Sequence, residues 1–296
     1  MTQIIAAITH DFALMATDRR LTFLNGRDAR KVADDDTCKL VNLCNISGIA
    51  YTGLARISGM PTHEWIAIRL AEHSCGSPAH AASILVESAT REISTTFYRG
   101  QQTFVMAGWD LPPGEKHLRA HLRIISNIYN SKGERLPNPS KGYIQFVNWL
   151  SDNRKWAAKV AGYDLKDNQV RHLRRLFGRL ADRKISSRTV LAALAQGVID
   201  TASVAQGVGS KVLCMCIPRG AAESAASGRG SQLLATADEV ACASFSYFDP
   251  AYSELRQYGP TVVCRGMACT TETENDPSRN YQSSQVKFLY MPKNNT

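Results

Sequence analysis

The second residue of the chain has the clearest potential for chemistry. Met1 is followed by Thr2, a residue small enough for the initiator methionine to be removed. Removal would place the threonine hydroxyl beside a free α-amino group. That amine, with a pKa of about 7.7–8.0, can accept the hydroxyl proton and make Thr2 a nucleophile with its own base. Any chain that begins Met-Thr has this potential, so the residues that follow must decide whether it is used.

Two later segments place polar residues at informative distances from Thr2. The segment ATDRRLT at residues 16–22 puts Asp18 sixteen residues after Thr2. Lys39 opens a strand-like run, and Gly53 follows Lys39 by fourteen residues in a turn of small residues. With these spacings the chain resembles the β-subunits of the proteasome and of its simpler bacterial ATP-dependent counterpart. These are N-terminal nucleophile (Ntn) hydrolases that begin with a catalytic threonine.

The resemblance implies a role for each of these residues. Lys39, as an ammonium near Thr2, would lower the pKa of the hydroxyl and of the amine, and Asp18 would hold Lys39 and balance its charge. The backbone N–H of Gly53 would stabilise the oxyanion, and the missing side chain would let substrate approach closely. Arg20 would brace the site. The substrate-binding residues would be Thr22, which pairs with extended substrate backbone, and four residues lining an apolar first specificity pocket of medium size: Leu21, Val41, Tyr51 and Ala55.

Each of these residues also has an ordinary structural explanation. Asp18 and Arg20 could form a surface ion pair, Lys39 could be a charge at a strand edge, and Gly53 could be a turn residue. Their joint occurrence at the spacings of the family favours catalysis.

The chain departs from the family in the second half of the site. The family has an Asp, then a Ser and two Gly, before its last core strand, whereas this chain has GVGS at 207–210 and Asp200 farther upstream. The Gly-Ser-Gly-Ser segment of the family has no clear match within 140–165. The supporting half of the site is therefore either rebuilt or lost.

The elements that must position these residues follow from hydrophobic periodicity and from turn residues. We expect strands at 3–9, 12–17, 39–44, 48–52, 103–109, 121–128, 211–217 and 261–264. Helices are expected at 62–73, 79–97, 167–181 and 186–204. The polar segments 25–37 and 131–141 are expected to be loops, and 219–232 a connector.

This order of elements predicts helices on both faces of a mostly antiparallel double sheet, which is an α+β protein. The resemblance refines this prediction to a four-layer αββα Ntn-hydrolase sandwich. The expected domains are a proteasome-like domain at 2–218 and a C-terminal extension at 219–296.

The charge of the chain is concentrated in one third of its length. The net charge is +9, and residues 101–200 contribute 17 basic against 8 acidic side chains. Most of the excess lies within 154–188, where apolar residues recur at helical spacing and the arginines fall mostly off that stripe. We interpret this as an amphipathic helix with a solvated basic face, and the alternative is a surface that binds nucleic acid or an acidic partner.

Composition narrows the class of protein further. Of 296 residues, 44% are hydrophobic and 21% charged, which allows a sizeable core and excludes wholesale disorder, collagen and coiled coil. No apolar run approaches the roughly 18 residues that span a bilayer, and the N-terminus lacks the features of a signal peptide. The eight cysteines form no C-x-x-C pair, which is typical of reduced thiols in a cytoplasmic protein.

Several standard catalytic and binding motifs are absent from the sequence. There is no Walker A loop, dinucleotide fingerprint, H-E-x-x-H or G-x-S-x-G, and the seven histidines lack metal-ligand spacing. We therefore expect no metal and no organic cofactor.

Taken together, the sequence predicts a threonine-type peptidase or amidohydrolase that acts through an acyl-enzyme on Thr2. The resemblance implies a peptide or protein substrate, a homo-oligomeric ring and a possible ATP-driven partner. The alternative is a catalytically silent relative that keeps the fold as an assembly or binding subunit. A nucleic-acid or acidic-partner binder is the third possibility.

Overall fold

The computed structural model describes residues 2–22, 32–34, 37–93, 100–130, 132–227, 244–248, 255–264, 266–276 and 281–291. Some sequence predictions fall outside these residues. They are the fate of Met1, most of the loop at 25–37, residue 131 of the loop at 131–141, and the last residues of the helix expected at 79–97.

The N-terminal strands lie at the centre of an antiparallel five-stranded sheet. Its strand order is β12-β1-β2-β13-β14, formed by Trp156–Gly162, Gln3–Thr9, Phe12–Asp18, Val212–Pro218 and Ser244–Phe248. The hairpin of β1 and β2 turns at His10 and Asp11 and pairs Ile4 with Thr17. This register brings the end of β2 beside the start of β1, so Asp18 lies opposite Gln3, the residue that follows Thr2.

The second sheet has eight strands in the order β11-β10-β9-β6-β5-β15-β16-β17. In that order they span Ile144–Trp149, Arg119–Ser126, Thr103–Asp110, Ser47–Thr52, Leu40–Leu43, Leu255–Cys264, Met267–Asp276 and Tyr281–Tyr290. Neighbouring strands are antiparallel except β5 and β15, which are parallel. Two small two-stranded sheets join β3 (Leu21–Thr22) to β4 (Val32–Asp34) and β7 (Arg56–Ile57) to β8 (Met60–Pro61).

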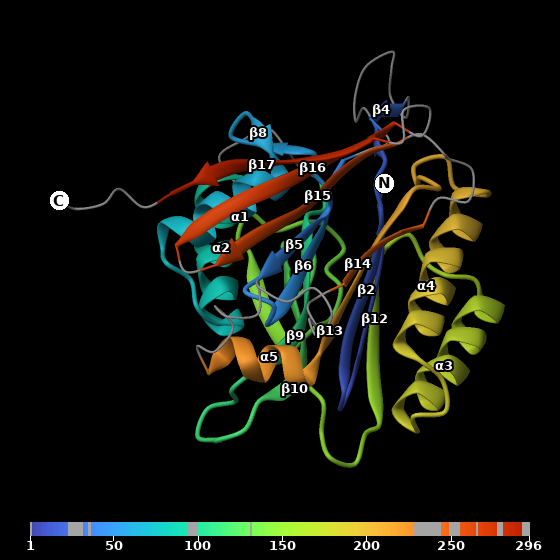
Figure 1. Cartoon of the computed structure of the whole chain (residues 1–296). Helices are drawn as coiled ribbons and strands as arrows, with labels where there is room; N and C mark the ends of the chain where they lie inside the picture. Colours follow the sequence, from blue (N-terminus) through green and yellow to red (C-terminus); the bar gives the residue numbers. More distant parts are fainter. Residues whose placement is uncertain are drawn as a thin grey trace.

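Two helix pairs lie on opposite sides of the paired sheets, as Figure 1 shows. On one side are α1 (Thr62–Glu72) and α2 (Pro78–Glu92), and on the other α3 (Asp167–Ala181) and α4 (Ser187–Ala202). The hydroxyl of Ser77 caps α2 and that of Ser186 caps α4, each accepting a backbone N–H of the first turn.

Strand alternation divides the core into three clusters. The first joins the facing sides of the two sheets, with Ile4 and Met15 from one sheet and Val105 from the other. The second joins the outer face of the larger sheet to α1 and α2, and the third joins the outer face of the smaller sheet to α3 and α4. Trp109 Nε1 also donates to the carbonyl of Ile217 at 3.2 Å and so ties the sheets together.

Most of the predicted elements are present, and the mixture of helices and sheets agrees with the α+β class. Several strands were not predicted, among them β11 and β12, and β4 lies within the segment 25–37 that was expected to be a loop. The run WAAKVAG of β12 contains four alanine or glycine residues, which have low β propensity.

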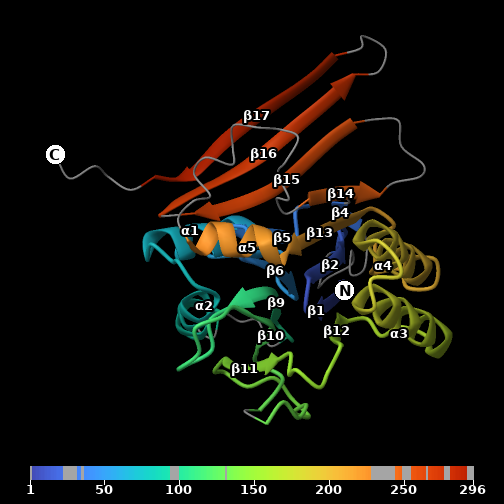
Figure 2. The ribbon, with the colours of Figure 1, turned by 60° about the horizontal axis from the view of Figure 1, so that its bottom comes forward.

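The C-terminal part of the chain contributes to both sheets. The connector predicted at 219–232 begins instead with a helix, α5 (Arg219–Ala226). Beyond it, β14 pairs with β13 in the smaller sheet, and β15 pairs with β5 in the larger one. Figure 2 shows β15, β16 and β17 side by side along one edge of the molecule. The extension thus continues the sheets that carry the site residues.

Candidate functional site

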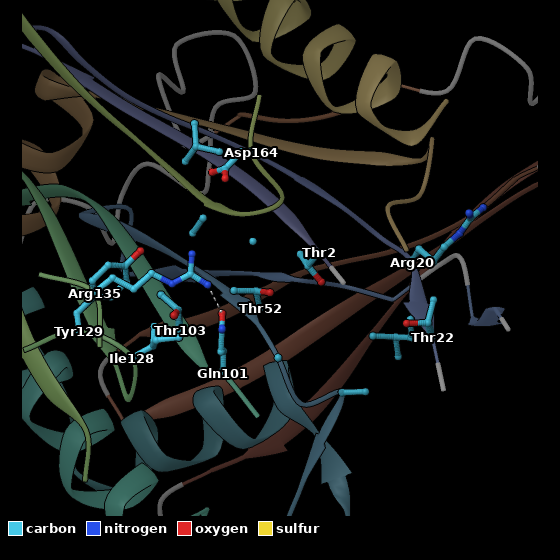
Figure 3. A pocket seen from close by; sticks show the side chains of 16 residues that line it. Thr2, Arg20, Thr22, Thr52, Gln101, Thr103, Ile128, Tyr129, Arg135 and Asp164 are labelled. Carbon is cyan, nitrogen blue, oxygen red and sulfur yellow. Dashed lines mark hydrogen bonds between the residues drawn. The ribbon is translucent and has the colours of Figure 1, made fainter. Parts of the chain in front are cut away.

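A cavity of about 410 Å³ opens beside Thr2. Figure 3 shows Thr2 near its middle, Arg20 and Thr22 to one side, and Gln101, Arg135 and Asp164 toward the other. The lining residues come from the starts and ends of strands in both sheets and from the loops that join them: Thr2, Arg20, Leu21, Thr22, Thr52, Gly53, Ala55, Gln101, Thr103, Ile128, Tyr129, Arg135, Val160, Ala161, Gly162 and Asp164.

Thr2 precedes β1 and is held through its backbone. Its side chain is buried, with a relative exposure of 6% for the residue, and its carbonyl accepts the N–H of Tyr163 at 3.1 Å. A side chain at Gly162, where φ is +88°, would collide with the Thr2 carbonyl. The glycine thus allows the end of β12 to fix the position of Thr2.

Lys39 reaches Thr2 from the second sheet. Its side chain is fully buried, and Nζ donates to Thr2 Oγ1 at 2.8 Å and to Asp18 Oδ2 at 3.2 Å. The carbonyl of Arg20 accepts a further hydrogen bond from the same atom. An ammonium has three hydrogens to donate, so these partners fix its orientation.

Asp18 closes the network on the side of Lys39 away from Thr2. Oδ1 accepts the N–H of Gln3 at 2.8 Å, and Oδ2 accepts the N–H groups of Arg20 at 3.1 Å and Gly209 at 3.2 Å. The buried carboxylate therefore has three backbone donors besides the ammonium. A buried ion pair is stable only when its remaining hydrogen-bonding capacity is used in this way.

The loop that follows α4 supports Asp18 and Arg20 through its backbone. Gly209 contacts Asp18 through its N–H, and Arg20 Nη1 donates to the carbonyls of Gln206 at 3.2 Å and Val208 at 3.3 Å. The sequence analysis left open whether this half of the site is rebuilt or lost, and in the structure backbone groups of residues 206–209 contact both side chains. The sequence gives no signal for this, because any residue can provide a backbone N–H or carbonyl.

Gly53 lies at the cavity wall with φ of +116°. A side chain at this position would collide with Gln102 Oε1 and with the carbonyl of Gln101. Gln102 Oε1 accepts the N–H of Leu54 at 2.5 Å, and the Gln102 N–H donates to Asn127 Oδ1 at 2.9 Å. The buried Gln102 side chain thus holds the turn that presents Gly53, a positioning role that the sequence did not reveal.

Of the predicted pocket residues, Leu21, Thr22 and Ala55 line the cavity, whereas Val41 and Tyr51 do not. Val41 and Tyr51 face α1 and α2 in the core, because alternate residues of β5 and β6 point to opposite faces. Tyr51 donates its hydroxyl to the Cys38 carbonyl at 3.3 Å, and burial raises the pKa of Tyr51 well above its usual value. Of the four residues predicted to line an apolar specificity pocket, the structure therefore places Leu21 and Ala55 at the cavity and the other two in the core.

Polar groups that the sequence analysis did not single out occupy much of the wall instead. Thr52 and Thr103 come from neighbouring strand ends of the larger sheet, and Gln101, Arg135 and Asp164 come from loops. Loops that are distant in sequence converge here only after the strands have paired. Sequence spacing therefore could not identify these residues.

Two buried cysteine thiols are poor nucleophiles. Burial raises the pKa of the Cys75 thiol to about 11 and that of Cys214 to about 12, which disfavours thiolates. The seven cysteines within the described ranges form no disulfide, and no three metal-binding side chains gather among those residues. None of the helices described is long and apolar enough to cross a membrane.

No family model and no curated protein matches this chain. What the chain does is therefore inferred from the contacts around Thr2 and from the residue pattern that contains them.

Proposed function

We propose that this protein is a threonine-type N-terminal nucleophile hydrolase that cleaves amide bonds through an acyl-enzyme on Thr2. One observation carries the proposal: the buried Lys39 ammonium donates to Thr2 Oγ1 at 2.8 Å while Asp18 holds it from behind. A cation at this distance favours the alkoxide form of the hydroxyl and lowers the barrier to nucleophilic attack.

The reaction follows from these groups. Once Met1 is removed, the neutral α-amine of Thr2 takes the hydroxyl proton as Oγ1 attacks the substrate carbonyl. The Gly53 N–H stabilises the oxyanion, and the proton passes to the departing amine. Water then hydrolyses the ester on Thr2 and restores the hydroxyl. The steps need no metal or organic cofactor.

The arrangement of layers supports an αββα Ntn-hydrolase fold for the chain. Two sheets share a core, and a helix pair packs on each outer face. The nucleophile begins a strand of one sheet, and Lys39 immediately precedes β5 of the other. In this arrangement the packing of the sheets sets the distance between nucleophile and ammonium.

The alternative function is a catalytically silent subunit of the same fold. A silent subunit would not need a contact between Lys39 and Thr2, and it would not need a cavity at Thr2. The hydrogen bond from Lys39 and the opening beside Thr2 both favour the active enzyme.

The proposed substrates are peptides or proteins bound in extended form along Thr22 and the Gly53–Ala55 turn. By resemblance we also propose a closed ring of identical subunits, with an ATP-driven partner as a further candidate. Three apolar side chains on or just after β17 are more than half exposed and would suit a subunit contact: Val286, Phe288 and Met291. Sedimentation velocity at micromolar concentration tests the ring, and a fully active monomer contradicts it.

Intact mass and electrophile capture test the enzyme itself. The mature chain should lack Met1, and a β-lactone should add once, to residue 2. Thr2→Ala should abolish the adduct, whereas Thr2→Ser should retain it, because serine offers the same hydroxyl and the same amine. Active protein with Met1 retained or acetylated would sink the mechanism, because the amine would be unavailable as the base.

A further inference from the structure

The connection between β10 and β11 carries an arginine to the cavity on a closed hairpin. Tyr129 and Arg135 form an isolated antiparallel bridge. The Asn130 N–H donates to the Glu134 carbonyl at 2.9 Å, and the Leu136 N–H donates to the Ile128 carbonyl at 2.7 Å. These bonds define the position of Arg135 on both sides of the bridge.

The hairpin is also packed against the strands beside it. The ring of Tyr129 meets Phe146 of β11 edge to face, with 5.9 Å between ring centroids. On β12, Lys159 places its ammonium 4.8 Å from the centroid of the Tyr129 ring. The hairpin that bears Arg135 is thus attached to both sheets.

The charge of Arg135 is not balanced by a carboxylate of the described residues. Its Nη2 donates to the neutral Gln101 Oε1 at 3.4 Å, and its neighbour Glu134 is bound by Asn130 Nδ2 at 2.7 Å. Asp164 lines the same cavity, and no ion pair of the described residues joins it to Arg135. The exposed guanidinium therefore keeps donors for a ligand, and a guanidinium matches the two oxygens of a carboxylate.

The position of Arg135 relative to Thr2 indicates which part of a substrate it meets. Figure 3 shows Arg135 on one side of Thr2 and Thr22 on the other. In the proposed function, extended substrate lies along Thr22 and the Gly53–Ala55 turn up to the scissile carbonyl. The chain beyond that carbonyl then continues toward Arg135.

We infer that Arg135 binds a carboxylate on the leaving side of the scissile amide. The preferred substrates are then amides whose amine component is acidic, either a C-terminal amino acid with its free carboxylate or an internal Asp or Glu residue. This inference rests on the proposed function for the place of the scissile bond. It adds a class of substrate and a residue that selects it.

Cleavage of two peptide mixtures tests this selection. Both contain acetylated tetrapeptides that are random at every position, and one mixture ends in a carboxylate whereas the other ends in a carboxamide. Mass spectrometry of the fragments should show that a residue with a carboxylate follows the cleaved bond more often than a neutral residue does. We expect an enrichment of about 10- to 100-fold, which corresponds to the free energy of one charge-assisted hydrogen bond. The carboxamide mixture reports side-chain carboxylates alone and so separates the two sources.

Two variants assign the enrichment to its residue. Arg135→Gln should lose it, and Lys132→Gln, which removes a charge from the same hairpin outside the cavity, should retain it. Where the wild type cuts peptides, cleavage without this enrichment, or equal enrichment in Arg135→Gln, overturns the inference.

Peptide retention on immobilised Thr2→Ala protein separates this inference from the proposed function. In one outcome the wild type cleaves no peptide, Thr2→Ala retains acidic peptides, and the double variant Thr2→Ala with Arg135→Gln does not retain them. The carboxylate site then stands, and the hydrolase proposal fails. If no acidic peptide is enriched by cleavage or by retention, the carboxylate site fails.

Discussion

Two regions beside the cavity are built in different ways. Behind Thr2, the Lys39 and Asp18 side chains are fully buried and bonded to several partners, and they lie at the ends of paired strands. On the cavity wall, Arg135 and Asp164 are exposed and carried by the connections between strands. The comparison indicates that strand register sets the positions of the groups that react at Thr2. The connections between strands, which can change in sequence without changing that register, set which substrate groups are bound.

The largest effect on activity should come from replacing Lys39, on the buried side of Thr2. Lys39→Met keeps most of the buried stem volume but removes the ammonium that contacts Thr2. We expect capture of a β-lactone at residue 2 to slow by about 10²–10⁴-fold, the usual value of a positioned acid–base group. Capture kinetics followed by intact mass measure this directly.

Folding of Lys39→Met must be shown alongside its kinetics. Asp18 keeps its three backbone donors in this variant, so a native circular dichroism spectrum is expected. Lys39→Arg should also be slow, because the larger guanidinium does not fit the enclosed position of the ammonium. Capture at the wild-type rate in folded Lys39→Met would remove Lys39 from the mechanism.

The next largest effect is on stability and concerns the close approach of the Gly162 backbone to Thr2. In Gly162→Ala the new methyl group meets the Thr2 carbonyl, and the bond from the Tyr163 N–H is disturbed. We expect a loss of about 3 kcal/mol in the free energy of unfolding, from left-handed strain together with a weakened hydrogen bond. Urea denaturation followed by tryptophan fluorescence gives the value.

Gly114 provides the matched control for that substitution. Its φ of +80° is similar, but a side chain there meets no atom within 4 Å. Gly114→Ala should therefore cost only about 1 kcal/mol, the strain of the backbone alone. Equal losses in the two variants would show that the approach of Gly162 to Thr2 does not matter for stability.

The same difference between strands and loops explains what could be predicted. The hairpin of β1 and β2 has a two-residue turn, so Asp18 falls opposite Gln3, the residue that follows Thr2, once the strands pair. Val41 and Tyr51 were misplaced because resemblance assigned them to a pocket while strand alternation turns them into the core. Arg135 was missed because its hairpin reaches the cavity through contacts with β11 and β12, two strands that were not predicted.

A third prediction separates the pH dependence of folding from that of the chemistry. Burial lowers the pKa of His63, on α1, to about 4, whereas an unfolded histidine titrates near 6.5. The unfolded chain therefore binds the proton first as the pH falls. The contribution of His63 to the free energy of unfolding is full above about pH 6.5 and declines by about 3 kcal/mol as the pH falls toward 4.

His63→Gln should reduce that decline, because glutamine does not titrate. Thermal unfolding of both proteins between pH 4.5 and 7.5 measures the difference, and parallel curves would contradict the assignment. The rate of capture at Thr2 should instead fall as the α-amine becomes protonated, at a pH below the ordinary amine value of about 8 because the Lys39 ammonium lowers the pKa of the amine. If the rate of capture falls at a higher pH than the free energy of unfolding does, the two pH dependences have separate causes.

The smallest effect on stability and activity is expected from changes on the basic face of α3. Leu173, Phe177 and Leu180 bury one side of this helix, and Arg174, Arg175 and Arg179 are exposed on the other. None of the three guanidinium groups lies at the cavity beside Thr2. Exposed charges of this kind contribute within about 0.5 kcal/mol each.

Replacing the three arginines together by glutamine should therefore leave both the urea midpoint and capture at Thr2 nearly unchanged. This variant also decides the remaining alternative function. A nucleic-acid site on α3 would bind with an affinity that falls steeply with salt, because phosphate contacts release counterions. Fluorescence anisotropy with labelled RNA and DNA at two salt concentrations should detect no such binding in the wild type. Salt-dependent binding that disappears in the triple variant would assign α3 a function of its own, independent of the cavity and of Thr2.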